Sequence, residues 1–488
     1  MPTLRPGATI SAVCSDRLTQ MTTAAPRALT RSTIATYAIG SLGTGGFGAL
    51  PGLVLVYYLT DTLGIAALAA GILVTAAKVW DVLIDPVIGA RSDHSLARRG
   101  TRRPVMLLGA ILLPILFVLT FAVPAGIGPL ASGIWVFVAF VAAATAFSMF
   151  QVPYIALPAE LTRSYDERTR LLAVRVVVLT IAILLFGAGA PEIRDAFADE
   201  RLGYLVMALS AAALMGVSLI ISSFVAPTGT VIAAPAVSVA ATYRAGIAAL
   251  NRSQSFRALL LTFLLQALAT GVMLAGAQYV ATWVLGTGVA LLFVALIGPA
   301  LLFAPLWAAI SRRSGKERAF VWASVLYGVA ALLIVLQLWW PGEWIYLPVA
   351  LAGAGYAGMQ ALPMSMLPDV ISHDSRRHKI ASAGTFGGVW TAGETTGLAL
   401  GATVLTLVLA TSGYVESVAN QVVTQPDSAI VGIIISFSIV PAVLIGLSLV
   451  TFRRYPLRRH DIEHADIEHV DTEPADTEAS SAPTDRGN

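Results

Sequence analysis

The sequence lacks two kinds of residue on which many soluble proteins depend. Cys14 is its single cysteine in 488 residues, so a disulfide framework is excluded, and in its polar surroundings this thiol is a poor candidate for a nucleophile or a metal ligand. Charged residues make up only 12% of the chain, about half of the ~25% that is usual in globular proteins. These shortages exclude an ordinary soluble enzyme and leave no basis for a nucleic-acid partner.

Hydrophobic residues are abundant instead. They form 57% of the chain, and the mean hydropathy is +0.78. Runs of about 20 apolar residues, the length that crosses a bilayer, can be placed twelve times. They cover residues 34–60, 65–90, 104–124, 130–158, 171–190, 203–226, 256–284, 287–311, 319–340, 344–367, 380–411 and 428–452. The sequence therefore predicts an all-α polytopic membrane protein in the lipid bilayer.

The basic residues are distributed unevenly along these runs. Of the 31 Lys and Arg residues, only Arg194 and Arg201 fall in a loop assigned to the outside, and Lys78 and Arg175 lie within spans. Because positive charge favours the cytoplasmic side, we expect both termini in the cytoplasm, with the protein in the cell (inner) membrane.

Composition divides the chain into five parts. We expect a disordered N-terminal extension with no secretory signal, in which Met21 could be the start, two six-helix bundles joined by a cytoplasmic linker, and a disordered acidic tail. A short interfacial helix is predicted in the linker over residues 243–250. The parts are residues 1–31, 32–226, 227–255, 256–453 and 454–488.

The tail repeats at a period of five residues, as DIEHA, DIEHV, DTEPA and DTEAS. This composition suits no packed core. Its histidines could bind a metal weakly, but a solvated tail that is dispensable for function is the favoured interpretation.

An internal repeat supports two related halves. The stretch PVIGARSDHSLARRGTRRP after the second run has a weaker counterpart, PLWAAISRRSGKERAF, after the eighth. Parallel halves of this kind are typical of one large class of transporter.

Three charges lie inside the second apolar run. Lys78, Asp81 and Asp85 are spaced i, i+3 and i+7, so they share one face of a helix. A charge at mid-bilayer depth costs about 2.5–3.5 kcal/mol, so the stripe must face the bundle interior. Pro86 loosens the helix beside it. The two carboxylates indicate an ion site; a structural pair of Lys78 with Asp81 is the alternative.

Other polar residues lie within or beside the spans. Ser148 and Gln151 belong to the fourth run, and Glu394 is the only acid deep in the second half. Arg175 opens the fifth run and either lines the cavity or reaches the interface. Polar groups inside a membrane are functional candidates.

Two short basic loops are predicted at the cytoplasmic side. The first, after Gly89, gathers arginines, and the second, after the tenth run, places acids beside Arg376, Arg377 and Lys379. We expect a cytoplasmic gate formed by Arg91, Asp93, Arg102, Arg103, Asp369 and Asp374.

Three ordered stretches carry a family resemblance: WDVLIDPVIGARSD, VPYIALPAELTRSYDERTRL and LPDVISHDSRRHKIASAGTF. On these, residues 32–455 resemble the major facilitator superfamily (MFS), and within it the glycoside–pentoside–hexuronide:cation symporters, which include melibiose permease. The resemblance implies twelve helices in two pseudo-symmetric bundles and transport by alternating access.

The resemblance also implies site residues. The cation would bind at Asp81 and Asp85, with Ser148 in place of a threonine hydroxyl and Gln151 adding an amide oxygen. Gly45 and Gln151 stand where melibiose permease has aspartates, and Glu394 or a neighbouring threonine stands near the place of its lysine. Cation coupling is thus better supported than galactoside transport.

The remaining candidates for the substrate cavity are polar or aromatic residues within spans. With those named above, the set is Gly45, Lys78, Gln151, Arg175, Gln266, Gln278, Trp283, Trp390 and Glu394. Tryptophan stacks on sugar rings, and the other polar side chains hydrogen-bond to hydroxyl groups.

The sequence thus predicts a monomeric secondary transporter, not an enzyme and without a cofactor, that couples Na⁺ or H⁺ to a small organic solute. Asp81 and Asp85 would ligate Na⁺, whereas a carboxylate removed from water can bind a proton instead. The substrate is expected to be a sugar or glycoside. A lysophospholipid or other amphiphile is the alternative, and a receptor or scaffold without transport is a third.

Overall fold

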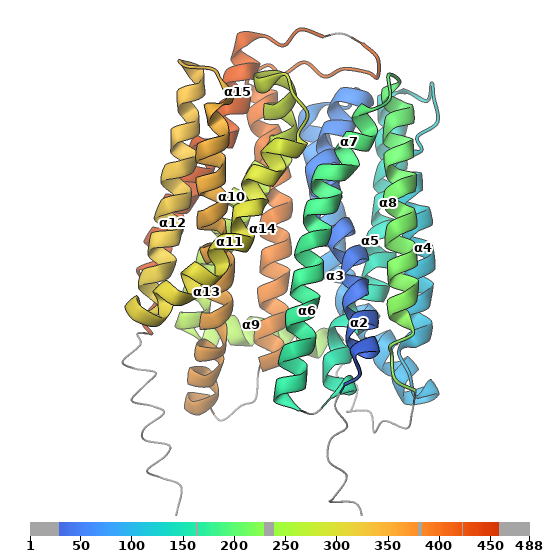
Figure 1. Ribbon diagram of the computed structural model, residues 1–488, viewed down its shortest axis with the longest axis vertical. Coiled ribbons are helices and arrows are strands. Elements are labelled where there is room, and N and C mark those ends of the chain that lie inside the picture. Colours follow the sequence, from blue (N-terminus) through green and yellow to red (C-terminus); the bar gives the residue numbers. More distant parts are fainter. Residues whose placement is uncertain (1–28, 163, 229–238, 379–382, 422, 458–488) are drawn as a thin grey trace, which may run out of the picture.

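The computed structural model describes residues 29–457 apart from 163, 229–238, 379–382 and 422. The described part is a bundle of long, upright helices, in which no strand longer than an isolated bridge occurs (Figure 1). The predictions for Cys14, Met21 and the repeat tail lie outside the described residues.

The first half contains six membrane-length helical segments, some interrupted by a π-helical turn. Proline at positions such as Pro51 and Pro86 is accommodated within these helices. In chain order the elements are α2 (Arg31–Tyr57) with η1 (Tyr58–Thr62), α3 (Ala67–Arg99), α4 (Arg103–Phe121), α5 (Gly128–Leu161), α6 (Tyr165–Leu184) with η2 (Leu185–Gly189) and α7 (Ala190–Asp195), and α8 (Glu200–Ser223).

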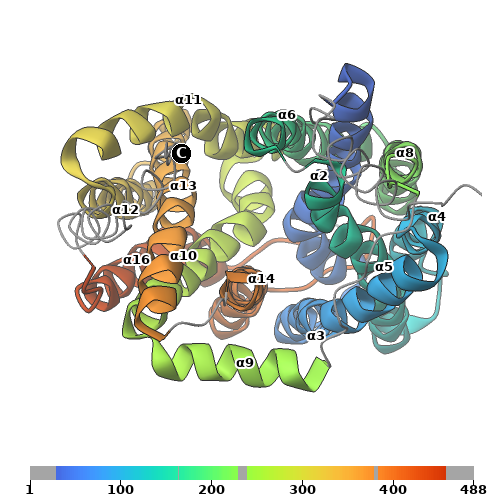
Figure 2. The ribbon, with the colours of Figure 1, turned by 90° about the horizontal axis from the view of Figure 1, so that it is seen from below.

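A lateral helix, α9 (Val239–Arg252), separates the halves in sequence and lies across one end of the bundle (Figures 1 and 2). It covers the stretch for which a linker helix was predicted. The second half then follows as α10 (Gln254–Tyr279) with η3 (Val280–Leu285), α11 (Ala290–Ser314), α12 (Lys316–Leu333) with η4 (Ile334–Leu338), η5 (Glu343–Ile345) with α13 (Tyr346–His378), α14 (Ala383–Thr411), α15 (Asp427–Phe437) and α16 (Ile439–Phe452).

Within the described residues, 12 helical segments are long and apolar enough to cross a membrane, which confirms the predicted number of spans. Many large apolar side chains, such as Ile72, Leu130 and Leu302, point outward. In water such exposure would be unfavourable, but in a bilayer it matches the acyl chains.

Helix α9 and the turn between α3 and α4 lie at the same end of the bundle, which we call the linker end. We call the other end the opposite end. Figure 1 shows the linker end at the bottom.

Two predicted loops are helical. Helix α3 continues to Arg99, so Arg91, Arg98 and Arg99 extend from a helix rather than from a loop. Helix α13 continues to His378 and carries Asp369 and Asp374 in the same way. The prediction of loops was wrong because a drop in hydropathy marks the membrane surface, whereas helical hydrogen bonding continues into water.

The internal repeat has a structural counterpart. Helices α3 and α11 both contain a proline and both end at a glycine with positive φ, Gly100 (φ 66°) and Gly315 (φ 89°). Glycine is favoured there because a side chain is strained in this conformation.

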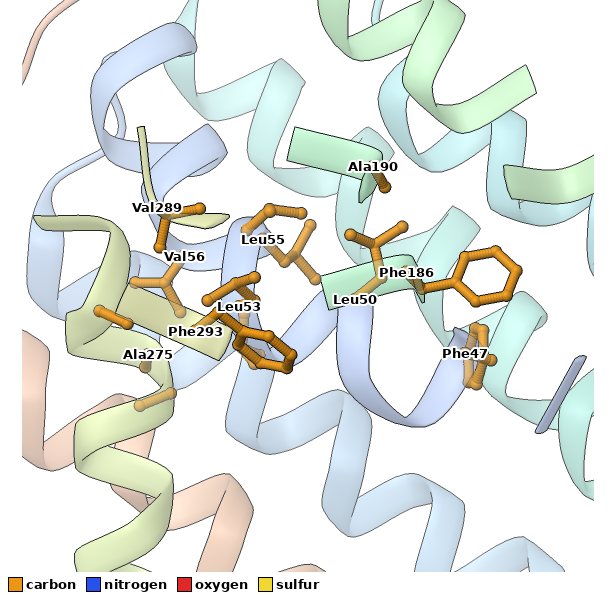
Figure 3. Close-up of a cluster of buried hydrophobic side chains, with 14 of the residues drawn as sticks. Phe47, Leu50, Leu53, Leu55, Val56, Phe186, Ala190, Ala275, Val289 and Phe293 are labelled. Atoms are coloured by element: carbon orange, nitrogen blue, oxygen red, sulfur yellow. The ribbon is translucent and has the colours of Figure 1, made fainter. Parts of the chain in front are cut away.

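An apolar contact closes the opposite end between the halves. Side chains of α2 lie between Phe186 of the first half and Phe293 of the second (Figure 3). At Gly187 the approach is close enough that an added Cβ atom would lie 2.1 Å from the ring of Phe293. The halves are therefore packed directly on each other at this level.

A short segment of the second half also pairs with the first. Leu63 and Val418 form an isolated antiparallel bridge, and the amide of Ala419 donates to the carbonyl of Thr62 at 2.9 Å. The amide of Ala67 donates to Glu416 at 2.8 Å. We call residues 413–420 the strap, because they connect the second half to the end of the first span.

Two glycines within spans have no neighbouring atoms around them. Gly48 is exposed although its neighbours along α2 are buried, and nothing lies within 4 Å of a Cβ atom added there. Gly387 of α14 is equally open and is seven residues from Glu394, on the same helix face. Gly48 and Gly387 thus border open space.

Candidate functional site

The charged stripe of α3 faces into the first half. Asp81 is only 8% exposed, and its Oδ1 accepts a hydrogen bond of 2.8 Å from the Ser148 hydroxyl of α5. Asp85, one turn further on, is half-buried. The i, i+4 spacing of a helix places both carboxylates on the face of α3 that meets Ser148 of α5.

Lys78 completes the group. Its Nζ lies 3.9 Å from Asp81 Oδ2, and it also lies over the rings of Phe47 (5.3 Å) and Phe140 (5.8 Å). Such contacts stabilise an ammonium group away from water. One ammonium nevertheless stands against two carboxylates, so the group carries a net negative charge when both carboxylates are ionised.

Gln151 lies one turn beyond Ser148 on α5. Its Oε1 is buried and has no hydrogen-bond partner among the described residues. A buried amide oxygen without a donor costs about 1–3 kcal/mol, so this oxygen is available to a ligand.

Arg175 of α6 is placed against the same helix. Its guanidinium lies 5.2 Å from the ring of Tyr154, which is one turn from Gln151, and its Nε has no partner in the described part. Gln151 and Arg175 thus bring unsatisfied polar atoms to α5, on the linker side of Ser148.

In the second half, Trp390 and Glu394 lie one turn apart on α14. Trp390 stacks on Phe263 at 4.2 Å, and its Nε1 is buried without a partner in the described residues. Glu394 accepts a long hydrogen bond (3.5 Å) from Gln360, which also donates to Tyr356. Glu394 is half-buried, whereas Trp390 is only 2% exposed and packs inside the second half.

The remaining predicted cavity residues lie elsewhere. Gly45 packs α2 onto α6, since an added Cβ atom would lie 2.8 Å from Ala182. Gln266 is 1% exposed and donates to Ser324 and Ser448 inside the second half. For these two, the face that each presents is covered by neighbouring helices, so the structure does not bring them to an open space.

Gln278 and Trp283 are at the opposite end, away from the predicted cavity. Gln278 accepts from the guanidinium of Arg194 at 3.3 Å, and Trp283 donates to Tyr414 at 2.9 Å. Both side chains therefore join polar contacts at the closed end of the molecule.

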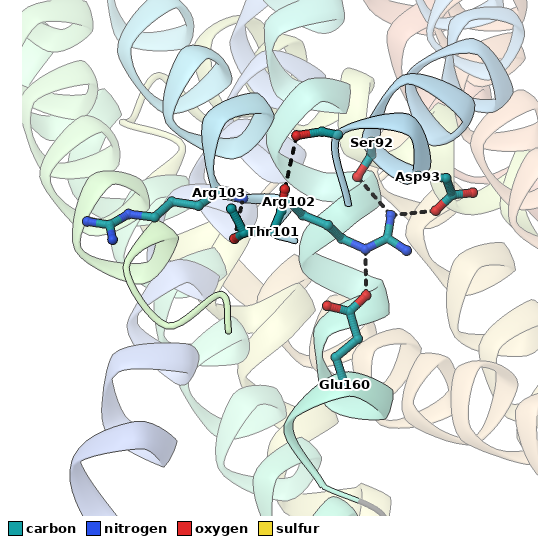
Figure 4. Close-up of polar contacts among 7 residues, drawn as sticks. Ser92, Asp93, Thr101, Arg102, Arg103 and Glu160 are labelled. Carbon is teal, nitrogen blue, oxygen red and sulfur yellow. Dashed lines mark hydrogen bonds and ion pairs between the residues drawn. The ribbon is translucent and has the colours of Figure 1, made fainter. Parts of the chain in front are cut away.

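A charge cluster holds the turn between α3 and α4 (Figure 4). Arg102 binds Asp93 and Glu160, each at 2.6 Å, and donates to Ser92 at 2.8 Å. Burial opposes the charge of Arg102, but hydrogen bonds and attraction from both carboxylates raise the pKa of its guanidinium. The cluster ties α3, α4 and α5 together.

The other predicted gate residues do not join this cluster. Arg103 lies over the ring of Phe224 at 3.9 Å. Asp369 binds Lys316 at 2.6 Å, and Asp374 binds Arg252 of α9 at 2.5 Å. The predicted gate residues thus form several separate contacts within the two halves, and among the described residues no ion pair joins a gate residue of the first half to one of the second.

Asp61 is a buried acid that sequence reasoning missed. It is 4% exposed, and its carboxylate accepts hydrogen bonds from Thr60 and from Tyr414 of the strap, each at 2.5 Å. In the sequence, Asp61 is an acid at the end of the first apolar run. An acid at this position is also common at a helix end that is exposed to water, so the sequence alone did not indicate burial. Only the arrival of the strap makes it a buried joint between the halves.

Arg194 is the second missed residue at this end. It is 7% exposed and contacts Asp195, Tyr204 and Gln278, where it lines a pocket of about 530 Å³. The sequence contained a signal for this residue, because Arg194 is one of only two basic residues in the loops assigned to the outside.

The fold defines a class of protein. Its helices superpose on the solved nucleoside transporter NupG with a TM-score of 0.64, over 88% of this chain and 100% of that one, at 12% identity. An identity this low speaks for a shared fold alone.

The family follows from sequence comparison. The model of the family described as MFS/sugar transport protein matches residues 36–459, and the chain belongs to that family. It is therefore a transporter and not an enzyme.

Three relatives match along most of their length. The chain is 26% identical to the glucuronide carrier protein homolog of Escherichia coli over 87% of this chain and 92% of the relative. It is 28% identical to the putative glycoside/cation symporter YagG of the same organism, over 84% and 88%. The sodium-dependent lysophosphatidylcholine symporter 1 of Gallus gallus is 24% identical over 86% and 85%.

Proposed function

We propose that this transporter couples the movement of Na⁺ or H⁺ through the Asp81–Asp85 pair to the uptake of a sugar or glycoside. The observation that carries the proposal is the charge balance on α3. Two carboxylates and one hydroxyl lie together with a single ammonium, at a depth where uncompensated charge is costly. A bound cation or proton would compensate the excess.

Na⁺ is the favoured coupling ion. Asp81 and Asp85 offer up to four carboxylate oxygens, and the Ser148 hydroxyl oxygen is within reach of Asp81. Hard cations prefer such a set of oxygen ligands. Lys78 weakens the local negative field, so coupling to H⁺ at the same carboxylates is the alternative.

The substrate would bind between the halves. The free Oε1 of Gln151 and Nε of Arg175 in the first half, and the free Nε1 of Trp390 in the second, suit hydroxyl groups or an acidic substituent of a sugar. The names of the two bacterial relatives support this class of substrate.

A lysophospholipid or other amphiphile is the second candidate. It is supported by similarity to a sodium-dependent lysophosphatidylcholine symporter over 86% of this chain and 85% of that relative. A thermal-stability screen of purified protein against sugars and lysolipids, with and without Na⁺, separates the two, because only the bound class raises the unfolding temperature.

We also propose that the linker end faces the cytoplasm of the cell, with both termini on that side, and that the protein works as a monomer in the inner membrane. Basic residues gather at this end, as positive-inside orientation requires. Each chain contains both halves and the whole carboxylate pair, so transport needs no second copy.

Uptake into proteoliposomes tests the coupling. A Na⁺ gradient at fixed pH should drive substrate accumulation, and Asp81→Asn should remove it. Accumulation driven only by a pH gradient without Na⁺ would reassign the pair to proton coupling. Substrate flux that ignores both gradients would overturn the coupled mechanism.

A further inference from the structure

A basic hollow lies at the linker end of α3, outside the carboxylate pair. It has a volume of about 370 Å³. Its lining residues recur at helical spacing on α3, with one apolar residue from α4: Arg91, His94, Ser95, Arg98, Arg99 and Val105. Three arginines and a histidine therefore converge on one small space.

The arginines of this hollow are not neutralised by nearby acids. Arg102 takes both Asp93 and Glu160. Within the described residues, no ion pair involves Arg91, Arg98 or Arg99, and all three are exposed. The hollow thus has the charge of a receptor for an anion such as a phosphate group.

An apolar stripe begins at the edge of the hollow. Above Val105, helix α4 exposes Leu108 (49%), Ile111 (49%) and Ile115 (54%), which lie three or four residues apart on one face. From Val105 to Ile115 the helix rises about 15 Å, which is half of a ~30 Å hydrocarbon core. The stripe therefore has the length of one lipid acyl chain.

We propose that this hollow and stripe bind an anionic phospholipid of the leaflet at the linker end. The phosphate would lie among Arg91, Arg98 and Arg99, and an acyl chain along α4. The apolar stripe favours a lipid over a soluble anion, since a free phosphate gains nothing from it. Basic pockets beside transmembrane helices at a membrane surface are suited to such headgroups.

Binding here has a structural consequence for the first half. The headgroup would hold the last turn of α3 next to the turn that Arg102 fixes to α5. Helix α3 also carries Asp81 and Asp85, so the lipid would stabilise the helix on which the proposed cation site is built. The lipid site itself does not depend on the identity of the transported solute.

Lipid titration of the purified full chain tests the site. Phosphatidylglycerol added to protein in neutral detergent should raise its unfolding temperature, and native mass spectrometry should retain the bound lipid. Arg98→Gln with Arg99→Gln should weaken the apparent affinity about 25-fold, at roughly a factor of 5 for each arginine.

A matched control is available in the second half. Arg312→Gln with Arg313→Gln removes the same charge from the same end of α11, the counterpart of α3. This double variant should keep the affinity within about 3-fold. Equal weakening by both double variants would overturn the proposal, because it would show general attraction to positive charge. Normal unfolding temperature in phosphatidylcholine nanodiscs verifies that both variants fold.

Two further measurements distinguish binding of a lipid from binding of a soluble phosphate compound. Inorganic phosphate and glycerol 3-phosphate at millimolar concentration should not reproduce the stabilisation. If either one does so as strongly as phosphatidylglycerol, the hollow is a site for soluble anions and the lipid assignment fails. Ile111→Trp, which obstructs the stripe, should weaken binding of the lipid and leave any binding of free phosphate unchanged.

Discussion

Asp85 is the carboxylate on which cation coupling is expected to depend most. Asp81 has Lys78 and the Ser148 hydroxyl as direct partners, whereas Asp85 is more open to an incoming ion. Asp85→Asn keeps the size of the side chain and removes its charge. We expect cation-stimulated uptake in proteoliposomes to fall at least about 10-fold, the effect of ~1.4 kcal/mol, while the protein remains folded.

The control for this variant is Asp427→Asn, which removes an exposed acid from the first turn of α15. Its uptake should match that of the unchanged protein. Full cation-dependent uptake by Asp85→Asn would remove the proposed site from α3.

Arg102 offers a comparison of two carboxylates at one guanidinium. Both ion pairs measure 2.6 Å, but the side chain of Glu160 is 13% exposed and that of Asp93 is 50% exposed. Breaking a buried pair costs about 3–5 kcal/mol and breaking an exposed one less than ~1 kcal/mol. Glu160→Gln should therefore lower the unfolding temperature much more than Asp93→Asn.

The unfolding temperatures of Glu160→Gln and Asp93→Asn, measured in the same detergent, give this comparison. Equal losses would mean that burial does not distinguish the two pairs. A loss confined to Asp93→Asn would reverse their assigned importance.

The strap connects the two halves at the opposite end, so this end can open during transport only when the strap moves. Leu63 and Val418 are paired across an antiparallel bridge, where Cα atoms lie about 4.5–5.5 Å apart, a separation that a disulfide can span. In a Cys14→Ser background, oxidised Leu63→Cys/Val418→Cys protein should lose uptake, and a reductant should restore it.

Each single cysteine variant serves as a control and should transport under oxidising conditions. Complete cross-linking with undiminished uptake would show that the strap stays in place throughout the cycle.

Gly187 belongs to the same closed end. An added Cβ atom would meet the Phe293 ring at 2.1 Å, whereas at Gly189 the nearest atom would be 3.9 Å away. Gly187→Ala should therefore impair closure of the opposite end and lower the uptake rate several-fold, in line with overpacking costs of about 1–3 kcal/mol. Gly189→Ala, the control, should transport normally; similar rates for both variants would contradict direct packing at Gly187.

At the scale of the whole molecule, the halves pack on each other at the opposite end, and Gly48 of α2 borders open space. In a Cys14→Ser protein, Gly48→Cys should react with a membrane-impermeant thiol reagent added at the linker side. Saturating cation and substrate should slow the reaction, because they favour closure around the site.

Thr424→Cys, on the exposed loop of the opposite end, verifies the sidedness of the reagent and should react only from that side. Labelling of Gly48→Cys from the opposite side alone would invert the orientation of the open space.

Much of the architecture is determined by the sequence itself. The number and positions of the spans depend on local composition. The shared face of Lys78, Asp81 and Asp85 depends on the fixed period of a helix. Both can therefore be predicted from the sequence without the tertiary structure. The pairing of the α3 stripe with Ser148 was expected through the family resemblance, and the structure places these groups in contact.

Only the tertiary structure decided which face of each span is covered. Gly45 and Gly48 are alike in sequence, yet one packs against α6 and the other borders open space. Asp61 is an ordinary helix-end acid until the strap, more than 350 residues away in sequence, buries it against Tyr414 at 2.5 Å. Such contacts depend on how the two bundles meet, and no local pattern in either bundle encodes that meeting.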